Sequence, residues 1–129
     1  MNDLELARTR LKEQGLSFCI VKHNKILFEG MSAGIKDILY IVSNEDIRDS
    51  SVADKIIGKA VALLLVKSKI KAAFALNINQ SALDTLSLNK IEAKYENLMN
   101  RLDSMCQFEM AVKDINDPKK ALETLSIFG

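Results

Sequence analysis

The chain has 129 residues, of which 48% are hydrophobic and 27% are charged, as in ordinary soluble globular proteins. Eighteen basic and seventeen acidic side chains leave a net charge of +1, and the aromatic residues are five Phe, two Tyr and no Trp. This composition argues against nucleic-acid and membrane-surface binding, because both need a field of one sign and base stacking also needs aromatic rings. One domain spanning residues 1–129 is expected.

The N-terminus alternates charged and apolar residues, unlike a secretory signal peptide. The longest uncharged apolar run, residues 60–66, is far shorter than the roughly 20 residues that cross a bilayer. Cys19 and Cys106 form neither a CxxC pair nor a disulfide framework. We therefore expect a cytoplasmic protein in a reducing compartment.

The first elements predicted are a helix and a β-hairpin. Residues 2–15 carry a cap at Asn2 or Asp3, an apolar stripe and a terminal Gly, as a helix does. Two β-rich runs, residues 16–22 and 25–30, flank His23-Asn24, where Asn tolerates the positive φ of a two-residue turn. His23 is the single histidine of the chain, so no His-based metal cluster can form, and we expect it at the surface.

Two helices are predicted next. Residues 33–44 have an amphipathic helical pattern, and residues 51–67 form a longer helix that is almost purely apolar beyond its first turns. In this longer helix Ser51 suits the N-cap and Asp54 the third helical position, which makes an S-x-x-D variant of the capping box.

Strand and helix patterns alternate in the rest of the chain. A strand is predicted over residues 69–78, a helix over 79–89 and a strand over 90–98. Helices over 104–116 and 117–128 complete the chain, and the second opens with an Asp-Pro start signal. This alternation predicts a three-layer α/β/α domain with a mixed sheet.

The charges near the start of the predicted 51–67 helix are the first candidate site. Asp54 is either part of the cap or a general acid/base at the mouth of a pocket, and the two roles are compatible. Lys55 and Lys59 either reach out to solvent or meet a phosphate or carboxylate at the helix N-terminus. Gly58 inside a helix indicates a point where a side chain would collide with the sheet.

Cys106 and Glu109 form a second candidate site. They lie one helical turn apart and could share a ligand, although a cysteine among Met and Phe is also typical of a core. Together with Asp54 they would suit iron or zinc with mixed sulfur and oxygen donors. The sequence contains no GxGxxG, P-loop, GxSxG or HExxH motif.

The segments SSVADKIIGKAVALLLVKSKIKAAFALNI and CQFEMAVKDINDPKKALETL resemble a bacterial and archaeal family of unknown function with a cytidine deaminase-like fold. The likeness covers nearly the whole chain, from LKEQGLSFCIVKHNKILFEG onward. It implies the order helix, hairpin, helix with a first motif, strand, helix with a second motif, strand.

In true deaminases the first motif is H-x-E or C-x-E and the second is P-C-x-x-C, and these residues bind zinc and move protons. Val52-Ala53-Asp54 stands where we expect the first motif, and NINQSALDTL, which contains Ser81, stands where we expect the second. Asp54 can replace the glutamate, but Val52 has no lone pair and the second segment has no cysteine. The resemblance therefore implies a deaminase-like fold without its zinc ligands and without deaminase activity.

The function that these observations favour is the binding of a small, nucleotide-like molecule. The expected site residues are Asp54, Lys55, Lys59, Asn79, Ser81, Cys106 and Glu109. The alternative is an enzyme in which Asp54 is the acid/base, Lys55 an anion partner and Cys106 a nucleophile, with iron or zinc held by Cys106 and Glu109. A purely structural protein is the third hypothesis, and self-association into a homo-oligomer is compatible with all three.

Overall fold

The computed structural model of the chain describes residues 1–32, 34–100 and 106–127. Its centre is a five-stranded sheet with the strand order β2-β1-β3-β4-β5. The strands are β1 (Phe18–Lys22), β2 (Lys25–Gly30), β3 (Ser51–Ile57), β4 (Ala72–Asn79) and β5 (Glu92–Met99). Strand β1 is antiparallel to β2 and β3, whereas β3, β4 and β5 are parallel to one another. The mixed sheet predicted from the sequence is confirmed.

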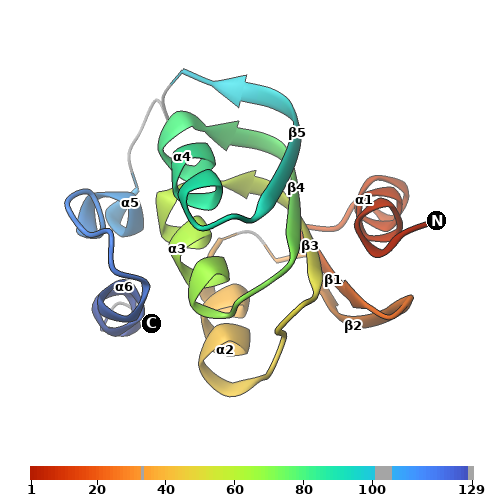
Figure 1. The fold of residues 1–129 in the computed structure, drawn as a ribbon, viewed down its shortest axis with the longest axis horizontal. Helices are drawn as coiled ribbons and strands as arrows, with labels where there is room; N and C mark the ends of the chain where they lie inside the picture. Colours follow the sequence, from red (N-terminus) through yellow and green to blue (C-terminus); the bar gives the residue numbers. More distant parts are fainter. Residues whose placement is uncertain (33, 101–105, 128–129) are drawn as a thin grey trace.

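Helices cover both faces of this sheet (Figure 1). The helices are α1 (Asp3–Gln14), α2 (Lys36–Asn44), α3 (Lys59–Lys67), α4 (Gln80–Leu88), α5 (Gln107–Ala111) and α6 (Pro118–Ser126). Helix α1 packs on one face, α2, α3 and α4 pack on the other, and α5 and α6 lie outside α3. The predicted three layers are present, with α5 and α6 added to the outer surface. No helix in the described part of the chain is long and apolar enough to span a membrane.

Local signals in the sequence set several element boundaries as expected. The side chain of Asn2 caps α1, which ends at Gly15 with a φ of 63°. His23 and Asn24 form the hairpin turn with φ values of 53° and 61°. Asp117 caps α6, and a proline follows it at the first helical position.

The expected helix over residues 51–67 is wrong in its first half. Ser51–Ile57 is strand β3, and α3 begins only at Lys59, with Gly58 as its N-cap. The first four residues of β3 are all buried because helices cover both faces of the sheet, so the strand lacks the in–out alternation that would distinguish it from the start of a buried helix. The capping box assigned to Ser51 and Asp54 does not exist, because both residues lie within the strand.

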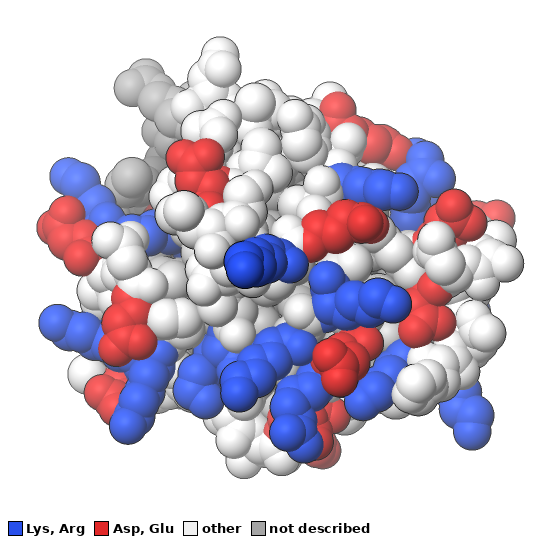
Figure 2. Space-filling view, viewed as in Figure 1, with Lys and Arg blue, Asp and Glu red and all other residues white. Residues whose placement is uncertain are grey.

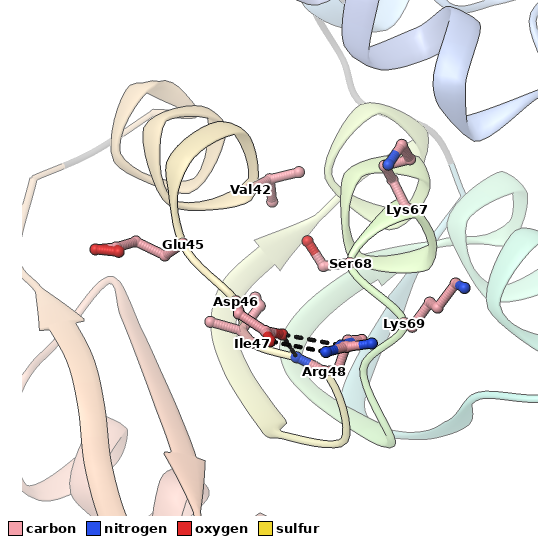
Figure 3. Close-up of a pocket in the computed structure, with 8 residues that line it drawn as sticks. All are labelled: Val42, Glu45, Asp46, Ile47, Arg48, Lys67, Ser68 and Lys69. Carbon is pink, nitrogen blue, oxygen red and sulfur yellow. Dashed lines mark hydrogen bonds and ion pairs between the residues drawn. The ribbon is translucent and has the colours of Figure 1, made fainter.

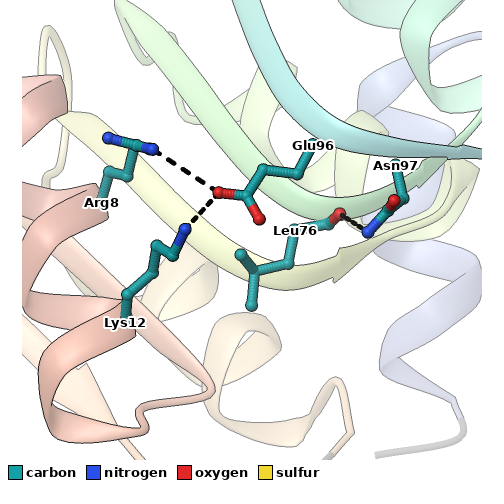
Figure 4. Close-up of polar contacts among 5 residues, drawn as sticks. All are labelled: Arg8, Lys12, Leu76, Glu96 and Asn97. Carbon is teal, nitrogen blue, oxygen red and sulfur yellow. Dashed lines mark hydrogen bonds and ion pairs between the residues drawn. The ribbon is translucent and has the colours of Figure 1, made fainter.

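The three parallel strands share an irregularity near their carboxyl ends. The register pairs Asp54 with Ala75 and then Ile56 with Asn77, and it skips a row between them. The same row is skipped between β4 and β5, and the freed carbonyls of Lys55 and Leu76 accept hydrogen bonds from the side chains of Asn77 and Asn97, both at 3.3 Å. Figure 4 shows the second of these contacts. The irregularity breaks the in–out alternation of the strands, which also hid β3 from sequence analysis.

Two apolar clusters hold the layers together. One lies between the sheet and helices α2, α3 and α4 and continues outward to α6, and the other lies between the sheet and α1. At the edge of the second cluster, Glu96 of β5 pairs with Lys12 and with Arg8 of α1, the latter at 3.6 Å (Figure 4). These pairs are partly exposed, so we expect each to contribute at most about 1 kcal/mol.

The predicted helix over residues 104–116 is much shorter in the structure. Helix α5 spans five residues, Gln107–Ala111, and is followed by turns that lead to α6. Residues 104 and 105 of the prediction lie outside the described residues.

Candidate functional site

The candidate site lies where two parallel strands end and two helices begin. Helix α3 begins at Lys59, two residues after the end of β3, and α4 begins at Gln80, directly after β4. Neighbouring parallel strands end at the same edge, so the N-termini of α3 and α4 point to the same region. Free N–H groups and the positive ends of the helix dipoles make such a place attractive to anions.

The carboxylate of Glu109 occupies this place. The residue comes from α5, is 7% exposed and accepts hydrogen bonds from the N–H groups of Lys59 (2.8 Å) and Ala60 (2.7 Å). A third hydrogen bond comes from the side-chain amide of Asn79, at 3.2 Å. Glu109 therefore caps α3 from a position 50 residues further along the chain. Each hydrogen bond to a charged group contributes about 1.5–3 kcal/mol where it forms.

Lys59 and Asn79 each make a second contact that fixes them at the site. The ammonium of Lys59, which is 9% exposed, donates to the backbone carbonyl of Lys113 at 2.9 Å. The side-chain oxygen of Asn79 accepts from the N–H of Ala82 at 2.8 Å and so caps α4. The structure thus brings Lys59, Asn79 and Glu109 together, all three of which were expected to bind the ligand.

Gly58 leaves the space in which the carboxylate sits. A Cβ built on Gly58 would lie 2.7 Å from the carboxyl carbon of Glu109 and nearer still to its Oε1. The backbone of Gly58 is extended, with a φ of −96° and a ψ of −179°, which any residue can adopt. The expected collision is therefore real, but it involves Glu109 and not the sheet.

Asp54 is buried in β3, four residues before Gly58. It pairs with Phe18 and Ala75, both of which belong to the apolar cluster under α2, α3 and α4, so it faces the helices. Its Oδ1 accepts from the N–H of Ile56 at 3.2 Å. Burial raises the pKa of Asp54 to about 7, although hydrogen bonds from the N–H groups of Ile56 and Lys55 act in the opposite direction. A carboxyl group with this pKa can both give and take a proton near neutral pH.

The other expected residues do not join the cluster around Glu109. Lys55 is exposed, and its N–H donates to the carbonyl of Ser17. Ser81 is exposed in the first turn of α4. Cys106 is exposed at the N-cap of α5, whereas Glu109 turns inward to α3, so the two side chains do not share a face as expected.

The structure does not assemble the expected metal site. In the described ranges no group of three or more His, Cys, Asp and Glu side chains is placed to hold a metal ion, and Asp54, Cys106 and Glu109 all belong to those ranges. The physical reason is that Glu109 is already bound to N–H donors, Cys106 points to solvent, and Asp54 lies within the strand.

The positions expected for the deaminase motifs also move to different helices. Because residues 51–57 are a strand, the helix that follows the hairpin is α2, and the next strand-helix pair is β3 and α3. The order implied by the resemblance then places the first motif at the start of α2 and the second at the start of α3. Those positions hold Ile35, Lys36 and Asp37 in α2, and Gly58, Lys59 and Ala60 in α3. None of these side chains is a histidine or a cysteine.

Two hollows lie at the opposite edge of the sheet, at the amino ends of the parallel strands. One, of about 330 Å³, lies between the loop before β3 and the end of α3 and includes Arg48, Lys67 and Lys69 (Figure 3). Another, of about 600 Å³, includes the first residues of β3, β4 and β5. Ligands of open α/β sheets bind at the carboxyl edge of the strands. The geometry therefore favours the place that Glu109 fills over either hollow.

Surface charge gives no further direction. On the face shown in Figure 2, basic and acidic side chains are interspersed, which agrees with the net charge of +1. Any attraction of an anion to the carboxyl edge would therefore come from the helix ends and from Lys59 and Asn79, and not from the overall charge.

Sequence analysis did not identify two backbone groups of this site or the role of Gly58. The N–H of Ala60 and the carbonyl of Lys113 are backbone groups, for which the sequence carries no signal. The role of Gly58 had a signal, because a glycine after a β-branched run is typical of the junction between a strand and a helix.

Comparison with known proteins places the chain among proteins without an assigned activity. The family described as "TM1506: Domain of unknown function (DUF1893)" matches residues 6–128. A crystal structure of a DUF1893 family protein (TM1506) from Thermotoga maritima is similar with a TM-score of 0.90 and 25% identity, over 99% of this chain and 90% of that one. No curated protein matches the chain.

A second solved structure has a much weaker similarity. It is a diaminohydroxyphosphoribosylaminopyrimidine deaminase/5-amino-6-(5-phosphoribosylamino)uracil reductase from Thermotoga maritima. Its TM-score is 0.47 with 17% identity, over 73% of this chain and 35% of that one.

Proposed function

Because this chain belongs to the DUF1893 family, whose name assigns no activity, we propose from its own side chains that it binds a small anionic molecule. The ligand carries a carboxylate or a phosphate, as a nucleotide does, and this group binds between the N-termini of α3 and α4. The protein does so without acting as a zinc-dependent deaminase.

The observation that supports this proposal is that the N-termini of α3 and α4 already bind a carboxylate. The Glu109 carboxylate is buried, and its partners are two N–H groups of α3 and the amide of Asn79. A phosphate or carboxylate from a ligand offers the same kind of acceptor atoms to these donors. Lys59 adds a positive charge beside them, and its ammonium now binds no more than a neutral carbonyl among the described residues.

Binding is tested by following the N–H resonances of Lys59 and Ala60 by NMR while ligands are added. The ligands are inorganic phosphate, a nucleoside monophosphate and the matching uncharged nucleoside. We expect phosphate and the nucleotide to shift both resonances and the nucleoside to leave them unchanged, because the anion makes the contacts.

Two lysines of α3 supply a matched pair of variants. Lys59→Gln removes the buried charge at the first residue of α3, and Lys67→Gln removes an exposed charge at its last residue. The proposal requires that Lys59→Gln weakens binding and that Lys67→Gln does not. Resonance shifts confined to the hollows at the amino edge, or equal effects of both variants, would contradict it.

An enzyme that uses Asp54 is the second candidate function. What favours it is the buried position of Asp54 together with a pKa of about 7, which suits a general acid/base. Asp54→Asn should abolish such an activity without weakening anion binding at Lys59 and Ala60. If both properties are lost together while the fold is kept, Asp54 belongs to the binding site.

A further inference from the structure

We propose that residues 106–113 form a strap whose Glu109 carboxylate competes with the ligand for the anion site and must leave when the ligand binds. This inference rests on the function proposed above and concerns its regulation. Glu109 is then an internal stand-in for the ligand's anionic group.

The strap reaches the site from outside the core layers. Helix α5 has five residues and lies on the outer side of α3 (Figure 1). Glu109 is its buried residue, whereas Cys106 and Met110 are exposed. The carboxylate is thus delivered to the ends of α3 and α4 by a short surface segment and not by an element of the sheet.

The site is shaped around a carboxylate-sized group. Gly58 has an extended backbone that needs no glycine, yet any Cβ there would overlap the carboxyl group of Glu109. Asn79 already has a full role as the cap of α4 through its oxygen, and its amide nitrogen is turned toward Glu109. Removal of the strap would leave a space bordered by two N–H groups and this amide.

The same strap also binds the positively charged group of the site. The ammonium of Lys59 is bound by the carbonyl of Lys113, four residues after Glu109. Movement of residues 106–113 would therefore free Lys59 in the same step as the N–H donors. A ligand anion could then take up all four donor groups, and this gain offsets the contacts that the strap gives up.

The rest of the C-terminal region is anchored independently of the strap. Helix α6 packs on α3, with Ala121 and Leu125 fully buried, and has its own cap at Asp117. The strap contributes Val112, which is buried, and Phe108, which is partly buried against the core. In the proposed movement the strap turns about its connection to α6 while α6 stays in place, and the cost of exposing these two apolar side chains returns it to the closed position.

The direct test compares phosphate binding by Glu109→Ala, by Glu123→Ala and by the wild type, measured by calorimetry and by the N–H resonances of Lys59 and Ala60. Glu123 is exposed in α6, so its loss changes the charge equally without touching the site. We expect Glu109→Ala to bind phosphate about tenfold or more tightly than the wild type, because apparent affinity scales with the fraction of open sites. Glu123→Ala should bind as the wild type does.

A second measurement uses the unmodified protein, so it does not depend on the folding of a variant. Phosphate should speed hydrogen exchange at the N–H groups of Met110 and Val112, because a five-residue helix displaced from α3 does not keep its own bonds to the carbonyls of Cys106 and Phe108. Phosphate that binds at Lys59 and Ala60 with no gain in Glu109→Ala and no faster exchange would overturn the strap and leave the site. Absence of any binding at these two N–H groups, in all three proteins, would overturn the site and the strap together.

Discussion

At the scale of single residues, two buried carboxylates have opposite environments. Glu109 is held by three hydrogen-bond donors at the ends of two helices. Asp54 lies within the sheet, and no ion pair among the described residues involves it. Burial therefore raises the pKa of Asp54 to about 7. This difference is the reason why we propose anion-site chemistry for Glu109 and proton chemistry for Asp54.

The raised pKa of Asp54 predicts how stability depends on pH. The folded protein binds the proton of Asp54 more tightly than the unfolded chain, whose pKa is near 3.8, so stability falls as pH rises from about 4 to about 7 and then stays level. At about 1.36 kcal/mol per pKa unit, the loss is up to about 4 kcal/mol. Asp54→Asn has no such charge, so it should be more stable than the wild type at about pH 8 and lose this advantage near pH 4.

Urea unfolding of both proteins across this pH range measures the difference. Asp114→Asn, which changes an exposed aspartate, serves as the control. Stability curves of Asp54→Asn and the wild type that run parallel from acid to neutral pH would show that Asp54 is not protonated in the folded state.

Gly58 and Glu109 should be energetically coupled. Gly58→Ala places a Cβ against the carboxyl group of Glu109, and we expect it to destabilise the protein by about 1–3 kcal/mol. In the background of Glu109→Ala the collision is gone, so the same change should cost little. Thermal and urea unfolding of the two single variants and the double variant form a complete cycle. Additive effects within about 0.5 kcal/mol would mean that Gly58 serves another purpose.

At the scale of elements, features that depend on neighbouring residues could be predicted from the sequence, and features that depend on distant residues could not. The cap at Asn2, the turn at His23-Asn24 and the Asp-Pro start of α6 depend on neighbouring residues, and each was read correctly from the sequence. Strand β3 was missed because its burial on both faces and its irregular register depend on β1 and β4. The capping of α3 by Glu109 was missed for the same reason, since the capping residue is 50 positions away.

Asn79 caps α4 and also donates to Glu109, so we expect its replacement by Asp to affect stability more than the same replacement at another helix cap. Asn79→Asp keeps an oxygen that can accept from Ala82, but it replaces the amide that faces Glu109 with a carboxylate. We expect a loss of about 1–3 kcal/mol from an unpaired, repelled buried charge. Asn2→Asp at the cap of α1 is the control and should be nearly neutral, because Asp and Asn cap helices about equally well.

This loss should depend on Glu109. When Glu109→Gln is added to Asn79→Asp, the two negative charges no longer face each other, and part of the stability should return. Unfolding by urea at neutral pH measures each step. A loss of the same size with and without the charge of Glu109 would indicate a packing defect and not repulsion.

At the scale of the whole molecule, the three layers and the mixed sheet followed from the alternation of strand and helix patterns. The sequence also suggested Lys59, Asn79 and Glu109 as ligand-binding residues, and the fold brings them together. It did not show that Glu109 would fill the place itself, or that Cys106 would face solvent. Which side of a short helix packs inward depends on the connection that precedes and follows it, and side-chain spacing alone does not determine that.

The layer order also carries the last prediction, which concerns deaminase chemistry. Zinc in true deaminases needs a His or Cys ligand at the start of one helix and two Cys ligands at the start of the next, so that bound water becomes a nucleophile near neutral pH. At the helix starts where the sequence resemblance would place these motifs, the chain has Ile35 and Asp37 in α2, and Gly58 and Lys59 in α3. None of these residues supplies a thiolate or an imidazole, and Asp37 is the one side chain among them that offers a metal donor. We therefore expect no deamination of cytidine, deoxycytidylate or guanine.

Ammonia release from each of these substrates, compared with a boiled sample, measures the activity, and elemental analysis of protein purified without a polyhistidine tag measures the metal. We expect release no faster than in the boiled sample and no stoichiometric zinc or iron, because the described residues form no metal-binding group.

Release that exceeds the boiled sample and falls on Asp54→Asn would instead identify Asp54 as the acid/base of a deaminase whose metal ligands are of another kind. Zinc that is retained by Glu109→Ala but lost on Cys106→Ser would locate such ligands near the strap.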